Sequence, residues 1–262
     1  MAHPQTAVPV APPAVDAFRA DGVVLLDGLL DADVVTRLRR ICARARPVGE
    51  GFWSESNVWR RDPSLREVLA DARVGGTLAA LLGSTQVWLF EETLLVKEAG
   101  SSTPTPWHQD LVHYPLSGSM VATLWVSLDA VAPDGGRVTY VRGSHRWGRR
   151  FASVGFTSGE TITAPGVDPV PQDVLDGGSR AVVSFPTRPG DCIVHHGLTL
   201  HGAPGNASRS ARRALAVSVF GDDVTYAPAA LPISHPAEPE LRAGHTLGEL
   251  FPRLWPEATW PA

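Results

Sequence analysis

The spacing of the apolar residues changes near residue 85, and this change constrains the fold more than any other feature of the chain. Before that point, apolar residues recur at helical spacing, as in Val34, Leu38 and Ile41. After it, short segments alternate between the two sides of a strand with a period of two. Turns rich in Gly, Pro, Asp and Asn separate these segments. Helices followed by many short strands predict a mainly β fold, a sandwich or barrel with helices packed on its outside.

The first third of the chain is predicted to be mostly helical. We expect a short helical turn at 15–20 and a short strand at 22–27. Asp31 is expected to cap a second helix, because an acidic side chain in front of apolar residues at helical spacing accepts hydrogen bonds from free N–H groups. A third helix is expected over 64–82, with Gly83 as its C-terminal stop.

The strands and the long loops lie in the rest of the chain. The predicted strands are 87–97, 121–128, 137–141, 182–185, 191–196 and 213–220. Two stretches, 152–180 and 222–248, show little periodicity, which is typical of lids and binding loops, with disordered surface insertions as the alternative. We therefore expect one domain over 1–262. Its parts are a flexible leader at 1–14, a mostly helical buttress at 15–84, a β core at 85–222 with a lid-like insertion at 152–180, and a C-terminal loop and tail at 223–262.

The composition argues against several classes of partner. A formal net charge of -4 gives no electrostatic reason to expect nucleic acid or an anionic membrane. No apolar run approaches the roughly 18 residues of a transmembrane helix, and the N-terminus lacks the basic and apolar segments of a signal peptide. The two cysteines, Cys42 and Cys192, cannot form a disulfide framework, so we expect a cytoplasmic protein.

Two short motifs carry candidate metal ligands. The first is Trp107-His-Gln-Asp110, in which His108 and Asp110 face the same side of a strand and can bind one ion. Such a pair also arises by chance. The second motif follows about ninety residues later, where a predicted strand ends at His201 and turns through Pro-Gly-Asn206. Two histidines and one carboxylate can hold ferrous iron with three coordination positions open, whereas zinc sites prefer Cys and His.

An arginine follows on the returning strand. If the hairpin turns near Gly205, the cross-strand neighbour of His201 is near residue 210, and Arg212 lies roughly 7 Å away. A five-carbon keto-diacid that chelates the metal through one end would place its far carboxylate near this planar guanidinium. Arg213 is the alternative. Arg212 is favoured because it alternates with small residues, which leave room for a ligand, whereas Arg213 alternates with bulky ones.

Further motifs complete a family resemblance. They are Trp125-Val-Ser-Leu-Asp129 followed by Asp134-Gly-Gly, Arg142-Gly-Ser-His145, Gly190-Asp191, and Asp21-Gly-Val-Val near the N-terminus. Over nearly its whole length the chain resembles the phytanoyl-CoA dioxygenase family of iron(II)/2-oxoglutarate-dependent oxygenases. The resemblance implies a double-stranded β-helix core (jelly-roll, cupin-like) with flanking helices. It also implies iron(II) on His108, Asp110 and His201, and 2-oxoglutarate held by Arg212.

Two residues on the strand before the first motif are further candidates for contact with 2-oxoglutarate. Lys97, the only lysine of the chain, matches a lysine that many members of the family carry near 2-oxoglutarate. The alternative interpretation is an exposed lysine on an edge strand. Thr93 shares the strand face of Lys97, and we expect its hydroxyl to contribute as well.

Four residues near these motifs are candidates for contact with the organic substrate. They are Phe90, Trp107, His113 and Tyr114. Aromatic side chains are expected in an apolar pocket, and Trp107 is placed best, with packing as the alternative. On the strand before His201, one of His195 and His196 is expected to face the pocket without binding the metal.

The resemblance implies an enzyme that uses dioxygen to hydroxylate an unactivated C–H bond of a small molecule, in specialised (natural-product) metabolism. Desaturation, epoxidation and ring formation would use the same ligands. Halogenases of this superfamily carry a small residue where this chain has Asp110, so halogenation is not expected. The alternatives are an acyl-CoA hydroxylase of catabolism and a non-catalytic, metal-binding jelly-roll or cupin-like module. Arg212 separates the last from an oxygenase, because such a module needs no cation for a dicarboxylate. The sequence gives no indication of the oligomeric state.

Overall fold

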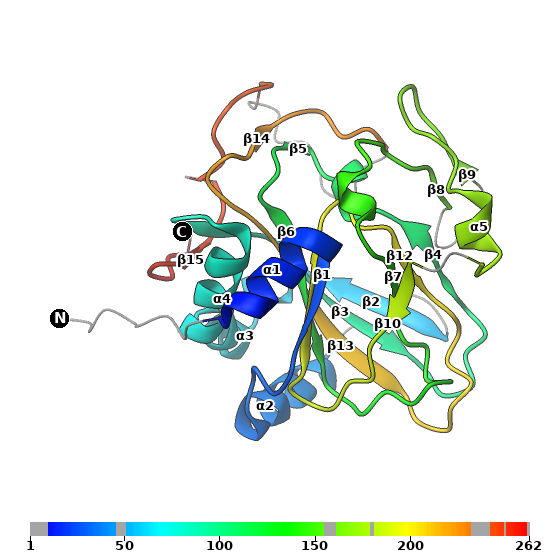
Figure 1. The fold of residues 1–262 in the computed structure, drawn as a ribbon. Coiled ribbons are helices and arrows are strands. Elements are labelled where there is room, and N and C mark those ends of the chain that lie inside the picture. Colours follow the sequence, from blue (N-terminus) through cyan, green and yellow to red (C-terminus); the bar gives the residue numbers. More distant parts are fainter. Residues whose placement is uncertain are drawn as a thin grey trace.

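The chain folds into two facing β-sheets with helices on the outside of one of them (Figure 1). The computed structural model describes residues 10–45, 51–154, 161–178, 181–231, 242–248 and 250–260. Its helices are α1 (Pro12–Asp21), α2 (Ala32–Cys42), α3 (Pro63–Leu69), α4 (Ala72–Leu82) and α5 (Gln172–Leu175), with 3-10 turns η1 (Val58–Arg60), η2 (Asp110–Val112) and η3 (Ser144–Arg146). Its strands are β1 (Val23–Leu26), β2 (Phe52–Ser56), β3 (Val87–Lys97), β4 (Thr105–His108), β5 (Leu116–Ser117), β6 (Val121–Ser127), β7 (Thr139–Val141), β8 (Ser153–Val154), β9 (Thr161–Ile162), β10 (Val182–Ser184), β11 (Cys192–His196), β12 (His201–Ala203), β13 (Arg212–Phe220), β14 (Thr225–Tyr226) and β15 (Arg253–Trp255).

The larger sheet has seven strands in the order β1-β11-β6-β13-β3-β15, and β2 also pairs with β3. The smaller sheet has four strands in the order β10-β7-β12-β4. The pairs within both sheets are antiparallel. The predicted class, mainly β with flanking helices, is confirmed, and two facing antiparallel sheets agree with the expected double-stranded β-helix core.

The main core lies between the first four helices and the outer face of the larger sheet (Figure 1). It joins helix residues such as Leu38 and Leu78 to strand residues such as Leu94 and Leu215, all fully buried. Because successive residues of a strand face opposite sides, packing one face of β3, β6 and β13 on the helices turns the other face toward the smaller sheet. The functional cavity lies on that inner face.

Two predicted helix boundaries are confirmed and one predicted helix is wrong. Asp31 caps α2 by accepting a hydrogen bond from the N–H of Val34 at 3.0 Å, and Gly83 ends α4 in the left-handed conformation. The single helix expected over 64–82 is two helices. Asp71 breaks it because its backbone is extended and its carboxylate caps α4 through the N–H of Arg73 at 2.9 Å.

The predicted buttress at 15–84 also contains a strand that sequence reasoning missed. β2 has little alternation in its sequence, and it pairs with β3 from Phe52↔Lys97 to Ser56↔Thr93. At the N-terminus, α1 begins at Pro12, inside the expected leader at 1–14; residues 1–9 lie outside the described residues. The first helix therefore begins three residues before the expected boundary, since Pro suits the first turn of a helix.

The stretch expected to be lid-like, 152–180, has structure of its own. It contains the β8–β9 hairpin and α5, and Val174 packs with Phe151 and Leu200 in a buried cluster. Residues 155–160 and 179–180 of this stretch lie outside the described part, and its function as a lid stays a prediction.

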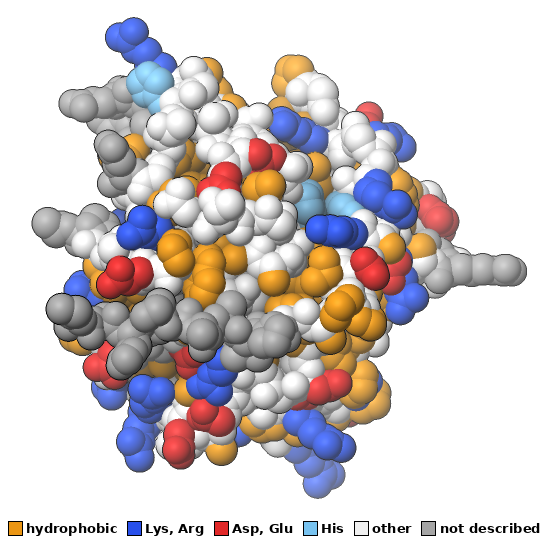
Figure 2. Space-filling view, turned by 60° about the vertical axis from the view of Figure 1, so that its left-hand side comes forward, with side chains coloured by type: hydrophobic (Ala, Val, Ile, Leu, Met, Phe, Trp, Pro, Cys, Tyr) orange, Lys and Arg blue, Asp and Glu red, His pale blue; other side chains and the backbone are white. Residues whose placement is uncertain are grey.

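The C-terminal tail, expected at 223–262, packs on the protein's own body. β15 pairs with β3, and Trp260 lies 5.4 Å from Trp59 between ring centroids. Residues 232–241, 249 and 261–262 lie outside the described part. None of the helices that the structure describes is long and apolar enough to cross a membrane. On the face shown in Figure 2, basic and acidic side chains are interspersed with apolar ones.

Candidate active site

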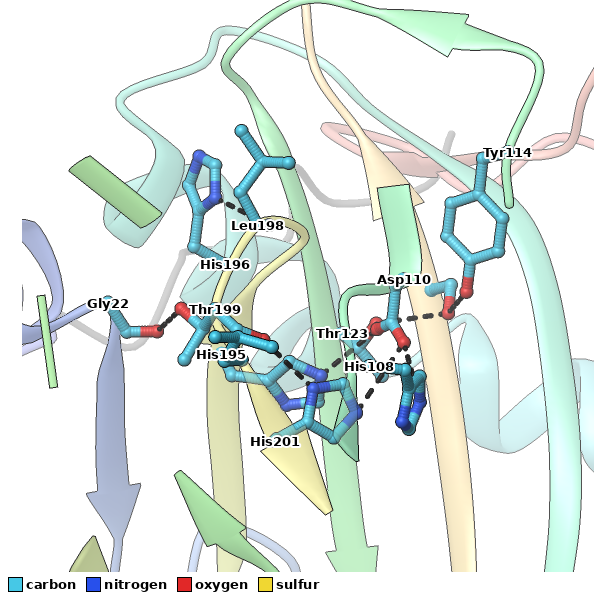
Figure 3. A network of polar contacts seen from close by, with 12 residues as sticks. Gly22, His108, Asp110, Tyr114, Thr123, His195, His196, Leu198, Thr199 and His201 are labelled. Carbon is cyan, nitrogen blue, oxygen red and sulfur yellow. Dashed lines mark hydrogen bonds and ion pairs between the residues drawn. The ribbon is translucent and has the colours of Figure 1, made fainter. Parts of the chain in front are cut away.

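A cavity of about 580 Å³ lies between the two sheets, and it brings together the three candidate metal ligands. His108 of β4 and His201 of β12 are direct cross-strand partners in the smaller sheet. Asp110 follows the extended residue Gln109 and begins η2, so its carboxylate returns to the same side as His108. The ligand atoms of the three side chains all lie within 4.8 Å of one another, and all three residues are buried (Figure 3).

Hydrogen bonds to the backbone fix the orientation of both imidazoles. Nδ1 of His108 lies 2.8 Å from the carbonyl of Pro106, and Nδ1 of His201 lies 3.0 Å from the carbonyl of Thr199. Since a carbonyl only accepts, each Nδ1 donates, which leaves Nε2 as the nitrogen that can bind a metal. Burial, and then the neighbouring imidazoles, lower the pKa of His201 well below its usual value, which keeps this ring neutral. Neutral imidazole is the form that binds metals.

Both Nε2 atoms face the same carboxylate oxygen. Oδ1 of Asp110 lies 3.5 Å from Nε2 of His108 and 3.5 Å from Nε2 of His201 (Figure 3). Burial raises the pKa of Asp110, but the surrounding imidazoles, His201 first, outweigh this effect and hold its pKa well below the usual value. Three acceptors therefore converge on one point, an arrangement that a cation between them satisfies.

Arg212 enters the same cavity from the larger sheet. It is 3% exposed, its Nη1 donates to the carbonyl of Gly136 at 2.6 Å, and its guanidinium lies 5.6 Å from the ring of Trp125. Burial lowers the pKa of Arg212 to about 10, so the group is charged at neutral pH. Its Nε is buried and has no hydrogen-bond partner within the described ranges. A buried, partly unsatisfied cation in a cavity indicates an anionic ligand.

The predicted cross-strand relation between His201 and Arg212 is wrong. β12 pairs with β4 and β7 in the smaller sheet, whereas β13 pairs with β3 and β6 in the larger one. The connection between β12 and β13 crosses from one sheet to the other and is held by Asn206, whose side-chain amide donates to the carbonyls of Lys97, Glu98 and Ser210. The two residues consequently lie on facing sheets and not as neighbours within one sheet.

The neighbouring Arg213 points the other way. It binds Asp129 with Nη2···Oδ1 at 2.6 Å and Nε···Oδ2 at 2.9 Å, on the helix side of the larger sheet. The small residues Ala216 and Ser218 line the cavity together with Arg212, as the alternation along the strand predicts. Of the two arginines, Arg212 is the one in the cavity.

Lys97 is fully buried, so its interpretation as an exposed edge-strand lysine is wrong. It is the cross-strand partner of Arg212, and its Nζ donates to the carbonyl of Pro204 at 2.7 Å. Burial, and then the charge of Arg212, lower the pKa of Lys97 to about 7. Lys97 is not a lining residue of the cavity, and its contact with the cosubstrate stays a prediction. Thr93 does line the cavity, with its hydroxyl 2.8 Å from that of Ser56.

Of the four predicted substrate contacts, only Tyr114 lines the cavity, with its hydroxyl 2.9 Å from that of Ser218. Trp107 was expected to be the best-placed substrate contact, and this is wrong. Its side chain lies on the face of β4 opposite to that of His108 and packs against the cluster around Phe151. Phe90 is buried behind Tyr114, with ring centroids 4.5 Å apart. His113 closes the η2 turn by donating its N–H to the carbonyl of Asp110, and it does not line the cavity.

Sequence reasoning missed several lining residues. They include Phe52, Trp53, Thr123, Trp125 and Tyr140. Thr123 and Trp125 share one face of β6, but every residue of this strand is buried, so the sequence shows no alternation that separates its faces. Of the histidine pair on β11, His195 faces the cavity, and His196 contacts the carbonyl of Ser119 at 2.8 Å.

A buried cluster of two histidines and one carboxylate, opposite a buried arginine between two β-sheets, defines the class of non-haem iron enzymes that use a keto acid. The model of the phytanoyl-CoA dioxygenase (PhyH) family matches residues 18–214, which is most of the chain. The chain belongs to this family, as the sequence motifs indicated. Among the curated proteins no match was found.

Similar solved structures agree with this assignment. The non-heme alpha ketoglutarate dependent carbocyclase SnoK from nogalamycin biosynthesis is 28% identical with a TM-score of 0.76, over 97% of this chain and 100% of that one. The epimerase SnoN in complex with Fe3+, alpha ketoglutarate and nogalamycin RO is 26% identical with a TM-score of 0.73, over 92% and 97%. EctD from S. alaskensis, at 19% identity and a TM-score of 0.66 over 87% and 88%, shares the fold. The expected class, an iron- and 2-oxoglutarate-dependent oxidoreductase, is confirmed.

Proposed function

We propose that this enzyme hydroxylates an unactivated C–H bond of a small molecule in specialised metabolism. His108, Asp110 and His201 bind iron(II), and Arg212 binds the far carboxylate of 2-oxoglutarate. The observation that carries this proposal is the shared cavity, in which three metal donors, two of them on the smaller sheet and Asp110 in the η2 turn beside it, face a buried cation on the larger sheet.

The donor set fits the metal. Two imidazole nitrogens and one carboxylate oxygen converge on one point and leave the cavity side open, which suits ferrous iron with its exchangeable positions. Bound iron(II), with 2-oxoglutarate and dioxygen, supplies an oxidant strong enough for an unactivated C–H bond and yields succinate and carbon dioxide.

The residues of this chain bind and orient the reactants. Arg212 orients the cosubstrate by its charge and by the free N–H of Nε, while its Nη1 stays fixed on Gly136. The cavity of about 580 Å³ falls within the range of about 300–1,000 Å³ typical of small-molecule sites, so it accommodates a small substrate beside the cosubstrate. Tyr114, Thr93 and the aromatic residues of β2 surround that space and limit the access of water.

The comparisons support natural-product metabolism over the catabolism of an acyl-CoA and over a non-catalytic module. SnoK and SnoN both come from the biosynthesis of nogalamycin, and both depend on alpha ketoglutarate. We further propose a cytoplasmic location, because Cys42 and Cys192 are both buried and free and because ferrous iron is favoured in a reducing compartment.

Ring closure or epimerisation is a second candidate for the outcome of the reaction. SnoK is described as a carbocyclase and SnoN as an epimerase, so ring closure and epimerisation occur on similar chains. Isotopically labelled dioxygen separates the candidates once a substrate is found: hydroxylation incorporates the label into the product, and ring closure or epimerisation does not.

The proposal is tested by the consumption of 2-oxoglutarate. Purified protein is incubated with iron(II), ascorbate, 2-oxoglutarate and a panel of small molecules, and succinate is measured for the wild type and for Asp110→Ala. We expect release from the wild type that rises with one group of candidate substrates and is absent in Asp110→Ala. A wild-type protein that binds neither iron(II) nor 2-oxoglutarate would refute the proposal.

A further inference from the structure

The second carboxylate oxygen of Asp110 is held by two side chains that are not metal ligands. Oδ2 accepts a hydrogen bond from Oγ1 of Thr123 at 2.7 Å and lies 3.0 Å from Nε2 of His195 (Figure 3). Oδ1 is the oxygen that faces the two ligand histidines at 3.5 Å. The two oxygens of this carboxylate thus have different surroundings, one bound by protein donors and one directed toward the metal position.

The direction of each hydrogen bond follows from the chemistry of the groups. The ionised carboxylate only accepts, so His195 donates through Nε2. Thr123 uses its single proton on Asp110, so Ser218, 3.1 Å away, donates to Thr123. Tyr114 then donates to Ser218. A continuous donor chain therefore runs from Tyr114 to Asp110 and fixes the direction of the Thr123 hydroxyl.

His195 is firmly placed and is not itself a ligand. It is 2% exposed, and its ring packs against those of His201 and Tyr140, with centroids 4.3 Å and 5.3 Å away. It lies on β11 of the larger sheet, and its Nε2 is occupied by Oδ2 on the side of the carboxylate away from the converging Nε2 atoms. The cluster able to hold a metal ion consists of the other three residues.

We propose that His195, together with Thr123, is a positioning residue that holds the Asp110 carboxylate so that only Oδ1 reaches the metal. A carboxylate that is free to turn can bind a metal with both oxygens, which would occupy one of the three open positions. The cosubstrate needs two of these positions and dioxygen needs one. This inference rests on the proposed function. It attributes the binding of iron through a single oxygen of Asp110 to His195 and Thr123, two hydrogen-bond donors that are not metal ligands.

The experiment compares iron binding in matched variants. His195→Leu removes the donor, whereas His195→Gln keeps an N–H close to the position of Nε2. His196→Leu is the control, because it removes the neighbouring imidazole, which contacts Ser119 and not Asp110. Each purified protein is titrated with iron(II) without oxygen, and then with 2-oxoglutarate, while the visible charge-transfer band of the complex is recorded.

We expect the iron(II) dissociation constant of His195→Leu to rise by about 10- to 100-fold, the usual effect of losing a partner of a metal ligand, and its charge-transfer band to shift. His195→Gln restores most of the affinity, and His196→Leu keeps the wild-type affinity and band. If His195→Leu binds iron(II) with wild-type affinity and an unchanged band, the inference is overturned.

A second pair of variants covers the case in which His195→Leu does not fold. Thr123→Val removes the other donor at nearly constant volume, and Thr123→Ser retains the hydroxyl. Weaker iron binding in Thr123→Val that Thr123→Ser reverses supports the inference, and wild-type binding in both overturns it. The wild-type titration tests the proposed function separately, since a wild type that binds iron(II) and 2-oxoglutarate retains that function whatever the variants do.

Discussion

Replacement of Arg212 by leucine separates the binding of the cosubstrate from the stability of the fold. Arg212 is 3% exposed, and burial lowers the pKa of its guanidinium to about 10, so the protein carries a cation that it solvates poorly in the absence of an anion. Replacing a buried ion pair by apolar side chains of similar size is often neutral or stabilising, and among the described residues Arg212 leaves no buried counter-ion behind when no ligand is bound. We therefore expect Arg212→Leu to unfold at the same temperature as the wild type or at a higher one when no ligand is bound.

The same change removes the counter-ion of the cosubstrate carboxylate. Loss of one partner of a buried, hydrogen-bonded charge pair costs about 2–5 kcal/mol. Because Nη1 of Arg212 is already bound to Gly136, we take about 3 kcal/mol, which corresponds to a roughly 150-fold rise in the dissociation constant of 2-oxoglutarate. Titration calorimetry of the iron(II)-loaded or Mn(II)-loaded protein without oxygen measures this constant directly.

Arg213→Leu is the matched control, one residue away on the opposite face of the same strand. It breaks the ion pair with Asp129, in which the arginine side chain is 36% exposed, so solvent screening limits the loss of stability to about 1 kcal/mol or less. Its affinity for 2-oxoglutarate stays at the wild-type value. Equal losses of affinity in both variants, or none in Arg212→Leu, would refute the assignment of Arg212 to the cosubstrate.

Three further predictions concern stability. Because burial and the charge of Arg212 lower the pKa of Lys97 to about 7, the folded chain binds fewer protons than the unfolded chain between this pH and the ordinary lysine pKa, so the stability of the wild type rises with pH there. Relative to Lys97→Met, that rise is at most about 1.4 kcal/mol per pH unit in urea unfolding measured from pH 7 to 9.5. A parallel pH dependence of the two proteins would contradict the lowered pKa of Lys97. Gly190 has φ +94°, and an added Cβ would collide with the carbonyl oxygen of Leu30, so we expect Gly190→Ala to lower the free energy of unfolding by about 2–4 kcal/mol. An unchanged urea midpoint would show that the backbone of Leu30 does not lie this close to Gly190. Asp71→Ala removes the cap that separates α3 from α4 and costs about 1 kcal/mol in the same assay, with Asp71→Ser expected to recover most of it.

The sequence predicts the metal site well because its geometry is local. A His-x-Asp pair in extended backbone places both side chains on one side, and the fold needs only to bring His201 opposite His108. The choice of Arg212 over Arg213 is equally local, since alternation along one strand decides which residue faces inward whatever the strand pairs with. This is why Arg212 lies in the cavity although the predicted pairing of its strand is wrong.

The rest of the site depends on long-range contacts that residue spacing does not encode. The connection between β12 and β13 resembles a tight hairpin in sequence, but long-range contacts, among them the anchoring of Asn206 on Lys97 and Glu98, direct it to the other sheet. Thr123 lies in a strand buried on both faces, which removes the alternation that would show its direction. His195 cannot be assigned to Asp110 without knowing that β11 and β6 are paired.

The central claim is that three side chains distant in sequence bind one iron, and anomalous diffraction from crystals grown with iron(II) and 2-oxoglutarate without oxygen tests it most directly. The account predicts one strong peak at the iron edge, bonded to Nε2 of His108, Oδ1 of Asp110 and Nε2 of His201, with Oδ2 of Asp110 still held by Thr123 and His195. A peak at another place, or no peak in a crystal whose cavity contains 2-oxoglutarate, would contradict it.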